Sequence, residues 1–286
     1  MENSNRQRYI SDAILLLTAF LWGIGFIPQK VVSADLSAFC FNALRYLIAG
    51  VVVLIFAKGK LPLHGTNLKN TLLAGLILFA AANAQQIGMR YTTVGNTSFI
   101  TAIYIVLVPF MAALLFKKKV GKRCYFAAFL ALVGLYLLTT SGKSLDAISM
   151  GDWIVLLGSI FWSLHIFVVK RGAESDNPIG FSAGQFLVCS FLNMICWLVS
   201  GNSQISAVIQ YKWWIIFSGV VVNGLAYTLQ VVGEKHTSES EGAIIMGMES
   251  VFGAIFGALI LHESLAPIQI TGAVLIMSAV LIAVKE

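Results

Sequence analysis

The chain has 286 residues, of which 58% are hydrophobic and 11% are charged, and its formal net charge is +6. A mean hydropathy of +0.85 excludes a soluble globular protein, because so apolar a chain could not cover its surface with polar groups. The positive charge does not indicate a nucleic-acid partner, because the basic residues lie in short segments between apolar runs. Such segments are expected at an anionic membrane surface. The composition predicts an all-α integral membrane protein.

Apolar segments long enough to cross a hydrocarbon core of about 30 Å recur along the chain. A polar segment, Met1–Asp12, precedes the first of them, and that first run is long enough to remain as a span, so we expect no cleaved signal peptide. Ten transmembrane helices are predicted, at 11–30, 36–56, 70–90, 95–116, 124–141, 151–170, 178–200, 212–233, 241–261 and 267–284.

The distribution of Lys and Arg predicts how these spans are oriented. If the N-terminus is inside, the inner segments hold 14 of the 19 basic residues and the outer segments hold four, while Arg45 lies within a span. Cytoplasmic loops carry an excess of this kind. We therefore expect a multi-pass protein of the cell (plasma or inner) membrane with both termini cytoplasmic.

The sixth predicted span repeats the first. Aligned without a gap, residues 12–30 and 152–170 share Asp12/Asp152, Ile14/Ile154, Leu16/Leu156, Leu17/Leu157, Trp22/Trp162 and Lys30/Lys170. An ancestral duplication explains this pattern, with one five-helix half at 1–142 and a second at 143–286. A half with an odd number of spans must insert the opposite way up, and inverted repeats of this kind are a construction of secondary transporters.

The six tryptophans fall into two groups. Trp153, Trp197, Trp213 and Trp214 lie at the outer ends of spans, as in an interfacial aromatic belt. Trp22 and Trp162 instead lie near the middle of their spans. Because these two spans run in opposite directions, both indole rings are expected at the membrane midplane.

Several short motifs occur in a fixed order along the chain. They are Trp22-Gly23 in the first span, Phe41–Arg45 in the second, Leu107-Val108-Pro109 in the fourth, Met248–Phe252 in the ninth, His262-Glu263 at its end and Gln269…Gly272 in the tenth. This series resembles the EamA-type transporters of the drug/metabolite transporter superfamily, end to end. The resemblance implies ten transmembrane helices in two inverted five-helix repeats, a central cavity and transport of small organic metabolites, often as export. The family usually has Glu-Pro where this chain has Glu249-Ser250, which removes an expected kink.

Polar residues recur at helical spacing inside the apolar spans. Because polar groups facing lipid are costly, they are expected to face a cavity or a partner helix. Stripes on repeat-related helices predict a substrate site at the midplane; the alternative is that they only hydrogen-bond neighbouring helices. The predicted substrate-binding residues are Trp22, Asn83, Gln86, Tyr104, Trp162, His165, Asn223, Tyr227 and Gln230.

The aromatic members of this set, Trp22, Trp162, Tyr104 and Tyr227, are expected to form walls of the site. They could stack on an aromatic side chain or bind a quaternary ammonium by cation–π contact. The alternative is that they fill space between helices.

Three further residues carry or could carry charge within the spans. Glu249 is the acidic residue at mid-depth, where an ionised carboxylate needs a partner. It predicts a proton-coupling or cation site, or else a carboxyl that sets helix packing, either protonated or paired with Arg45. Arg45 either binds a substrate carboxylate or anchors a neighbouring helix. His165 replaces the Gly25 of the first half and either carries protons or packs.

Other classes of protein fit less well. No Gly-x-x-x-x-Gly-Lys-Ser/Thr sequence occurs, which argues against ATP as the direct energy source. An intramembrane enzyme is the alternative class, but His262-Glu263 lacks the second histidine of a zinc motif, because position 266 is Ala. The four cysteines show no metal spacing and are interpreted as buried apolar residues.

The sequence thus predicts a secondary transporter that moves a small organic metabolite, an amino acid or related compound, by alternating access and favours export. Uptake of a quaternary amine such as choline is the alternative. The expected partners are the substrate, the lipid bilayer and protons as coupling ion, with no cofactor, no metal and no nucleic acid. The chain is expected to be a monomer or a weak dimer.

Overall fold

The computed structural model describes residues 2–92, 94–140, 149–260 and 266–284, and within these ranges every regular element is a helix. Serine and asparagine side chains begin several of them: Ser37 caps α2, Ser149 caps α7, Asn177 caps α8 and Ser238 caps α12. Such caps satisfy amide groups that the first turn leaves without a partner. The helices are α1 (Glu2–Val32), α2 (Ala38–Phe56), α3 (Gly65–Tyr91), α4 (Val94–Ala102), α5 (Tyr104–Leu114), α6 (Lys122–Thr140), α7 (Met150–Ala173), α8 (Pro178–Val199), α9 (Ile205–Gln210), α10 (Lys212–Phe217), the π-helix η1 (Ser218–Leu225), α11 (Ala226–Gly233), α12 (Glu239–Met246), α13 (Glu249–Ile260) and α14 (Pro267–Val284).

The helices have the length and polarity of a membrane bundle. Among the described residues, eight helical segments are long and apolar enough to cross a membrane, and Pro267–Ala283 is a shorter apolar helix. The remaining expected span is α6, which packs along α14. Large apolar side chains such as Leu114, Val199 and Leu281 are exposed on the outside, whereas Asn42, Gln185 and Glu249 are buried. The predicted all-α integral membrane fold is confirmed.

Three spans are interrupted in ways that the sequence did not predict. The fourth is divided at Ile103 into α4 and α5, and the ninth at Gly247-Met248 into α12 and α13. The ninth span is therefore broken even without the Glu-Pro that was expected to bend it. The eighth contains the π-helix η1, and π segments within α-helices often occur at functional sites. The expected loop after the seventh span contains the short helix α9. The predicted boundary between the halves, at 142 and 143, and the ends of the fifth and ninth spans lie outside the described residues.

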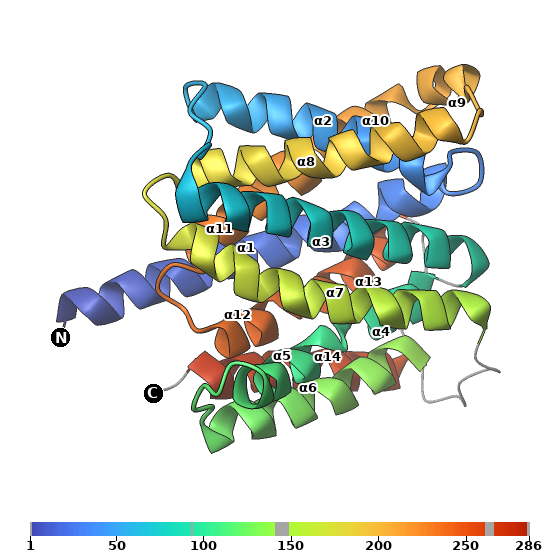
Figure 1. Ribbon diagram of the computed structural model, residues 1–286. Helices are drawn as coiled ribbons and strands as arrows, with labels where there is room; N and C mark the ends of the chain where they lie inside the picture. Colours follow the sequence, from blue (N-terminus) through green and yellow to red (C-terminus); the bar gives the residue numbers. More distant parts are fainter. Residues whose placement is uncertain (1, 93, 141–148, 261–265, 285–286) are drawn as a thin grey trace.

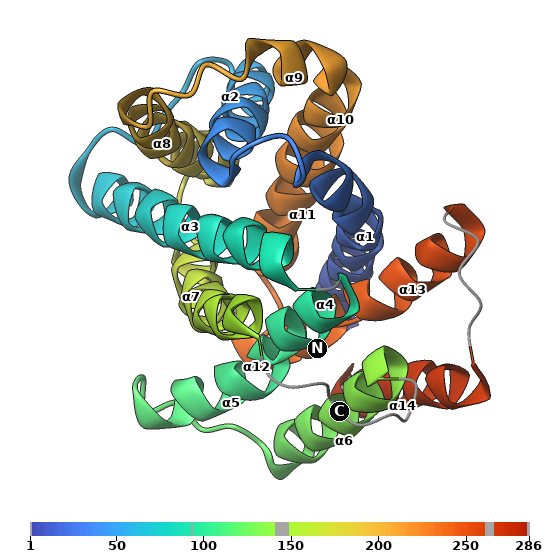
Figure 2. The same ribbon diagram turned by 90° about the vertical axis from the view of Figure 1, so that its right-hand side faces the viewer.

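Both chain termini lie at the same end of the bundle, which we call the terminal face (Figure 1). The connections between α2 and α3, α5 and α6, α7 and α8, and α11 and α12 reach the same end. In the view turned by 90°, α2 and α8 lie on one side of the molecule and α6 and α14 on the opposite side (Figure 2). Between these pairs lie α1, α3, α7, α11 and α12, and they form the middle of the bundle.

The helices of the two halves pack in reciprocal pairs. The third span contacts the sixth (α3 and α7), and the equivalent first and eighth spans also contact each other (α1 and α11). The pairs α2·α8 and α6·α14 each join one helix of the first half to its equivalent in the second half. Matching close contacts repeat this relation: a Cβ on Gly75 would lie 2.9 Å from the Gln185 carbonyl oxygen, and one on Gly219 would lie 2.9 Å from that of Arg45. Reciprocal contacts of this kind are those of a two-fold arrangement.

The pair α6·α14 is held by close backbone approach at two glycines. A Cβ on Gly134 would lie 2.7 Å from the Gly272 carbonyl oxygen, and a Cβ on Gly272 would lie 2.5 Å from that of Gly134. The Gln269 side-chain amide also donates to the Leu138 carbonyl at 2.8 Å. Small residues allow membrane helices to approach in this way.

Replacing Gly134 with Ala should therefore destabilise the protein, because the added methyl group must push the two backbones apart. Overpacking of this kind costs about 1–3 kcal/mol, so thermal unfolding of the purified protein should begin at a lower temperature. The matched control is Gly121→Ala, where a Cβ meets no atom within 4 Å. Equal unfolding temperatures for the two variants would contradict the close α6·α14 contact.

Candidate functional site

A cavity with a volume of about 50 Å³ lies in the middle of the bundle. Helices of both halves contribute to it, so it lies between the repeats rather than within one of them. Its volume is enough for a few water molecules. Its lining residues are Trp22, Phe26, Gln29, Arg45, Gln85, Thr101, Tyr104, Trp162, His165, Ile166, Val222, Asn223, Tyr227, Gln230, Met246 and Glu249.

An aromatic cluster forms one part of the wall, and Tyr227 is at its centre. The Tyr227 ring centroid lies 4.7 Å from that of Trp22 and 6.0 Å from that of Trp162. The His165 ring lies 6.2 Å from the same tyrosine. The predicted meeting of Trp22 and Trp162 is thus found around one shared residue. Rings this close pack against one another, and the faces and edges that they turn to the cavity can contact an aromatic or cationic ligand group.

The two tryptophans differ in their hydrogen bonds. The Trp162 indole N–H donates to Oε1 of Gln85 at 2.8 Å. The Trp22 indole N–H is buried and has no partner among the described residues. Both rings are partly buried. The two tryptophans therefore differ in their polar contacts and not in their exposure. The Trp22 N–H is therefore a donor that a bound ligand can use.

The halves differ in charge at one pair of equivalent positions. In the second half the His165 ring nitrogen Nε2 lies 2.9 Å from Oε1 of Gln185. The equivalent positions of the first half are Gly25 and Arg45, so no side chain at position 25 engages the guanidinium. Arg45 instead donates from Nε to Asn42 Oδ1 at 2.8 Å and lines the cavity. A positive charge therefore enters the cavity from the first half alone.

Arg45 is also held by two aromatic rings. Its guanidinium carbon lies 4.8 Å from the Phe41 ring centroid and 4.9 Å from that of Tyr46. Cation–π contacts and one hydrogen bond compensate part of the cost of burying the charge. The ion pairs recorded for the described residues do not join Arg45 to Glu249, which disfavours the alternative of a packing pair.

Glu249 and Tyr104 meet at two helix breaks. Tyr104 is the first residue of α5 and Glu249 the first residue of α13, and the tyrosine hydroxyl donates to Glu249 Oε1 at 3.1 Å. A helix N-terminus carries partial positive charge, which favours a carboxylate there. Only 5% of Glu249 is exposed. The broken fourth and ninth spans thus bring an acid and its hydrogen-bond donor to the cavity.

The π-helix η1 brings a further polar side chain to the same cavity. Asn223 lies within it, is buried, and neither its Oδ1 nor its Nδ2 has a partner in the described part of the chain. Two other lining atoms, Thr101 Oγ1 and Gln230 Oε1, are in the same condition. Buried polar groups are normally paired with protein or water, so these atoms favour a polar ligand or ordered water in the cavity.

Two predicted site residues lie outside the cavity lining. Asn83 Nδ2 donates to Asn193 Oδ1 at 2.9 Å, and Asn83 Oδ1 accepts from Asn42 Nδ2 at 3.0 Å. The Gln86 amide donates to the Gln29 backbone carbonyl at 3.1 Å. Both positions therefore fit the alternative in which polar residues join helices. The other predicted residues, Arg45 and Glu249 included, line the cavity, and His262-Glu263 lies outside the described residues.

The sequence did not single out several lining residues. Gln85 contacts both Trp162 and, at 3.5 Å, Gln29 Oε1. Gln85 is the neighbour of Gln86 along the chain, but the two side chains point to different sides of α3. The side that contains Asn83 and Gln86 faces other helices, and the side that contains Gln85 faces the cavity. Thr101 lies one helical turn before Tyr104 and Gln29 two turns after Trp22, and this spacing is the signal that could identify them. The apolar residues Phe26, Val222, Ile166 and Met246 carry no sequence signal that separates them from core residues.

The fold and cavity define a class of protein: a polytopic membrane protein with a cavity between two similar halves, an arrangement typical of transporters. Comparison with known proteins agrees. The model of the EamA-like transporter family matches the chain twice, at residues 10–140 and 149–285. The chain belongs to this family.

Individual relatives extend over most of the chain. An "uncharacterized transporter" of Archaeoglobus fulgidus is 30% identical over 277 residues, covering 96% of this chain and 86% of that protein. A chloroplastic WAT1-related protein of Arabidopsis thaliana is 23% identical, covering 95% and 69%. A crystal structure of a protein with 15% identity superposes with a TM-score of 0.79 over 96% of this chain and 97% of that chain, which shows that the fold is shared. These names indicate a transporter rather than an enzyme.

Replacing Asn83 with Leu should lower the stability of the protein but leave the cavity lining intact. The buried amides of Asn42 and Asn193 would each lose a partner, at a cost of about 1–3 kcal/mol. Thermal unfolding measures this, with Asn202→Ala in an exposed loop as control, because only the backbone of Asn202 is used, by Trp197. If Asn83→Leu unfolds like the wild type and instead loses ligand binding, the structural assignment of Asn83 is wrong.

Proposed function

We propose that this membrane transporter is a secondary transporter that moves a small organic metabolite by alternating access around the central cavity. The observation that carries the proposal is the cavity itself. It lies between the two halves and is lined by an acid, a base, an aromatic cluster and polar atoms without partners in the described residues. A midplane site between repeats is what alternating access by rocking of the halves requires.

An inverted relation of the halves is part of this proposal. The reciprocal pairing of helices supports it, and so does the odd number of spans expected in each half. The terminal face carries the connections that are rich in Lys and Arg, among them the segment Lys117–Arg123. An excess of basic residues is typical of the cytoplasmic side, so we place the terminal face in the cytoplasm and the protein in the cell membrane.

The chemistry of the lining favours a zwitterion. Arg45 can bind a carboxylate bidentately, whereas Glu249 and the rings of Trp22, Trp162 and Tyr227 favour a cationic group. An amino acid or a related compound carries both groups at once. The cavity of about 50 Å³ has room for a few water molecules, and we propose that separation of the halves enlarges it for the substrate. Export is the direction we propose, in line with the resemblance to family members that are often exporters.

The alternative substrate is a quaternary amine such as choline, taken up by the cell. The observation that favours it is the contact of Trp22 and Trp162 with one shared tyrosine, because aromatic rings of this kind surround quaternary ammonium groups. Such a ligand would not need Arg45. The effect of Arg45 on binding therefore separates the two substrate classes.

Glu249 is the coupling residue that we propose. It is buried, lies at a helix break and is hydrogen-bonded to Tyr104, which begins the repeat-related half-helix. A carboxyl in such a place can alternate between a protonated form and a form paired with the substrate cation. Proton movement through this group would link substrate flux to the pH gradient.

Replacing Glu249 with Gln should abolish flux driven by a pH gradient while leaving the protein folded, because the amide cannot exchange a proton. The measurement is substrate flux in proteoliposomes with and without an imposed gradient, in both directions. Glu174→Gln is the matched control, because 60% of the Glu174 side chain is exposed at the end of α7. Flux in Glu249→Gln with the pH dependence of the wild type would exclude the coupling role.

Binding should depend on the two central tryptophans. A thermal-shift screen of the purified protein against amino acids, aromatic metabolites and quaternary amines should give a stabilising ligand. Trp22→Ala and Trp162→Ala should each weaken its binding by at least tenfold, about 1.4 kcal/mol, because each removes one face of the aromatic cluster. Trp213→Ala, on an exposed outer ring, is the control.

The same binding measurements can contradict the central cavity as the binding site. If the ligand binds Trp22→Ala and Trp162→Ala as tightly as it binds the wild type, the central cavity is not the binding site. Arg45→Gln in the same assay separates the substrate classes: it should weaken binding of a carboxylate-bearing ligand and leave that of a quaternary amine unchanged.

A further inference from the structure

A second acid is buried between the central cavity and the terminal face. Glu234 directly follows α11, one turn beyond Gln230, and its exposed fraction is 0%. Within the described part of the chain, neither of its carboxyl oxygens has a hydrogen-bond partner. Burying a carboxyl without direct partners is costly, and neither the fold nor the proposed site at Glu249 accounts for it.

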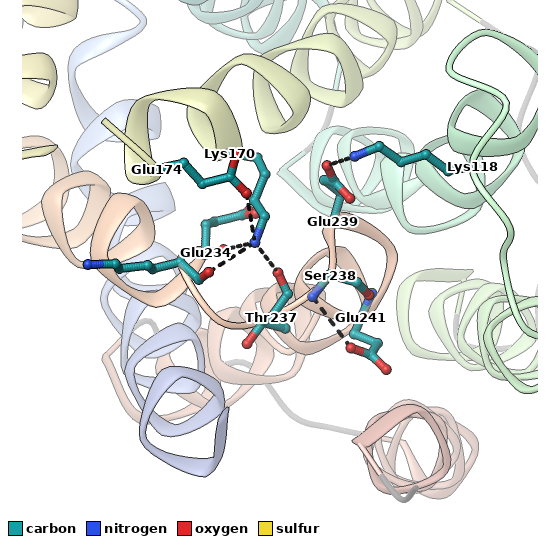
Figure 3. A network of polar contacts seen from close by, with 9 residues as sticks. Lys118, Lys170, Glu174, Glu234, Thr237, Ser238, Glu239 and Glu241 are labelled. Atoms are coloured by element: carbon teal, nitrogen blue, oxygen red, sulfur yellow. Dashed lines mark hydrogen bonds and ion pairs between the residues drawn. The ribbon is translucent and has the colours of Figure 1, made fainter. Parts of the chain in front are cut away.

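A network of charged groups surrounds this residue at the terminal face (Figure 3). The Lys170 ammonium donates to the backbone carbonyls of Glu234, Lys235 and Thr237, and lies 3.8 Å from Glu174. Lys118 pairs with Glu239. The turn between α11 and α12 is thus bound from α7 and from the connection between α5 and α6.

Further contacts bind the same turn to the start of α1. Arg8 pairs with Glu241 at 3.1 Å, and the Thr237 hydroxyl donates to Asp12 at 2.7 Å. The segment Glu234–Glu241 is therefore bound by α7, by the connection between α5 and α6, and by α1, and the Glu234 carboxyl is buried against it. A Cβ on Gly242 would be 3.6 Å from Glu234 Oε1, which places this carboxyl against the first turns of α12.

Glu234 lies, along the chain, between residues that line two hollows. Gln230, one turn earlier, lines the central cavity. A second hollow of about 510 Å³ opens at the terminal face, and Ser238, Glu239 and Lys118 are among its lining residues. A buried acid whose neighbours along the chain line both a substrate cavity and a hollow that contains several charged residues is suited to act as a proton relay.

We propose that Glu234 is a second proton-binding site, distinct from Glu249, that exchanges its proton with water in the hollow at the terminal face. The O–H bond of the carboxylic acid breaks there, and the proton passes to a water molecule; the reverse step restores the acid. The inference deepens the proposed function and rests on it, since a proton site beside the substrate cavity serves proton-coupled transport.

Burial and the positive charges around Glu234 act in opposite directions on the equilibrium between its protonated and ionised forms. Burial raises the pKa of Glu234 well above its ordinary value, the positive charge of Lys170 opposes the rise, the charge of Glu239 adds to it, and the charge of Lys118 lowers it. From α1, Asp12 is held through Thr237, and α8 and η1 contain no charged residue. The acid form is thus favoured by burial, and Lys170 keeps the ionised form within reach.

Infrared difference spectra of the purified wild-type protein, recorded between low and high pH, test this site without any substrate. We expect a band from a protonated buried carboxyl that is lost in Glu234→Gln, remains in Glu249→Gln and remains in the control Asp176→Asn, which changes an exposed acid. The band should shift on transfer to heavy water within the mixing time, because the proton exchanges with the hollow.

A second variant keeps the test informative if Glu234→Gln does not fold. In Lys170→Met the cation that stabilises the ionised form is gone, so the band should persist to higher pH, by about one pH unit or more. A spectrum of Glu234→Gln equal to that of the wild type, or no shift in Lys170→Met, would overturn the proposal. Loss of pH-driven flux in Glu249→Gln is measured separately, so the two proton sites can fail independently.

Discussion

The cost of placing polar groups against lipid determines how this molecule is built. A bundle with apolar side chains such as Leu114 and Val199 on its outside must bury every amide, acid and base that its spans contain. Once inside, these groups either join helices, as Asn42, Asn83 and Asn193 do, or line the central cavity. The same constraint therefore produces both the stability of the bundle and the chemistry of its centre.

The two halves share a framework and differ where the cavity acquires charge. Trp22 and Trp162 occupy equivalent positions in the two halves and both pack against Tyr227 of the second half. His165 binds Gln185 in one half, while Gly25 leaves Arg45 directed to the cavity in the other. Glu249 and Glu234 both belong to the second half. In the proposed transport cycle, the symmetric framework would let the halves move as similar bodies, and the asymmetric charges would hold the substrate in one orientation.

Much of the fold followed from the sequence, because hydrophobic length and repeat patterns report directly on membrane spans. Trp22 and Trp162 were identified by the repeat and by their depth, Glu249 by its depth, and the cavity is lined by all three. The helix breaks at Ile103 and Gly247-Met248 and the π-helix around Asn223 were not predicted, because they depend on tertiary packing and not on Pro or Gly-rich signals. Gln85 was missed for a related reason: α3 presents it to Trp162 through a rotation that a stripe on an ideal helix does not specify.

The central claim is that one cavity, between the two halves, opens alternately to the two sides of the membrane. Accessibility of a single cysteine at position 230, in a background without Cys40, Cys124, Cys189 and Cys196, tests it most directly. In sealed vesicles, a membrane-impermeant thiol reagent should modify Gln230→Cys from either side, and the ligand found by screening should protect it from both. Modification from one side only, whatever the ligand, would contradict the account.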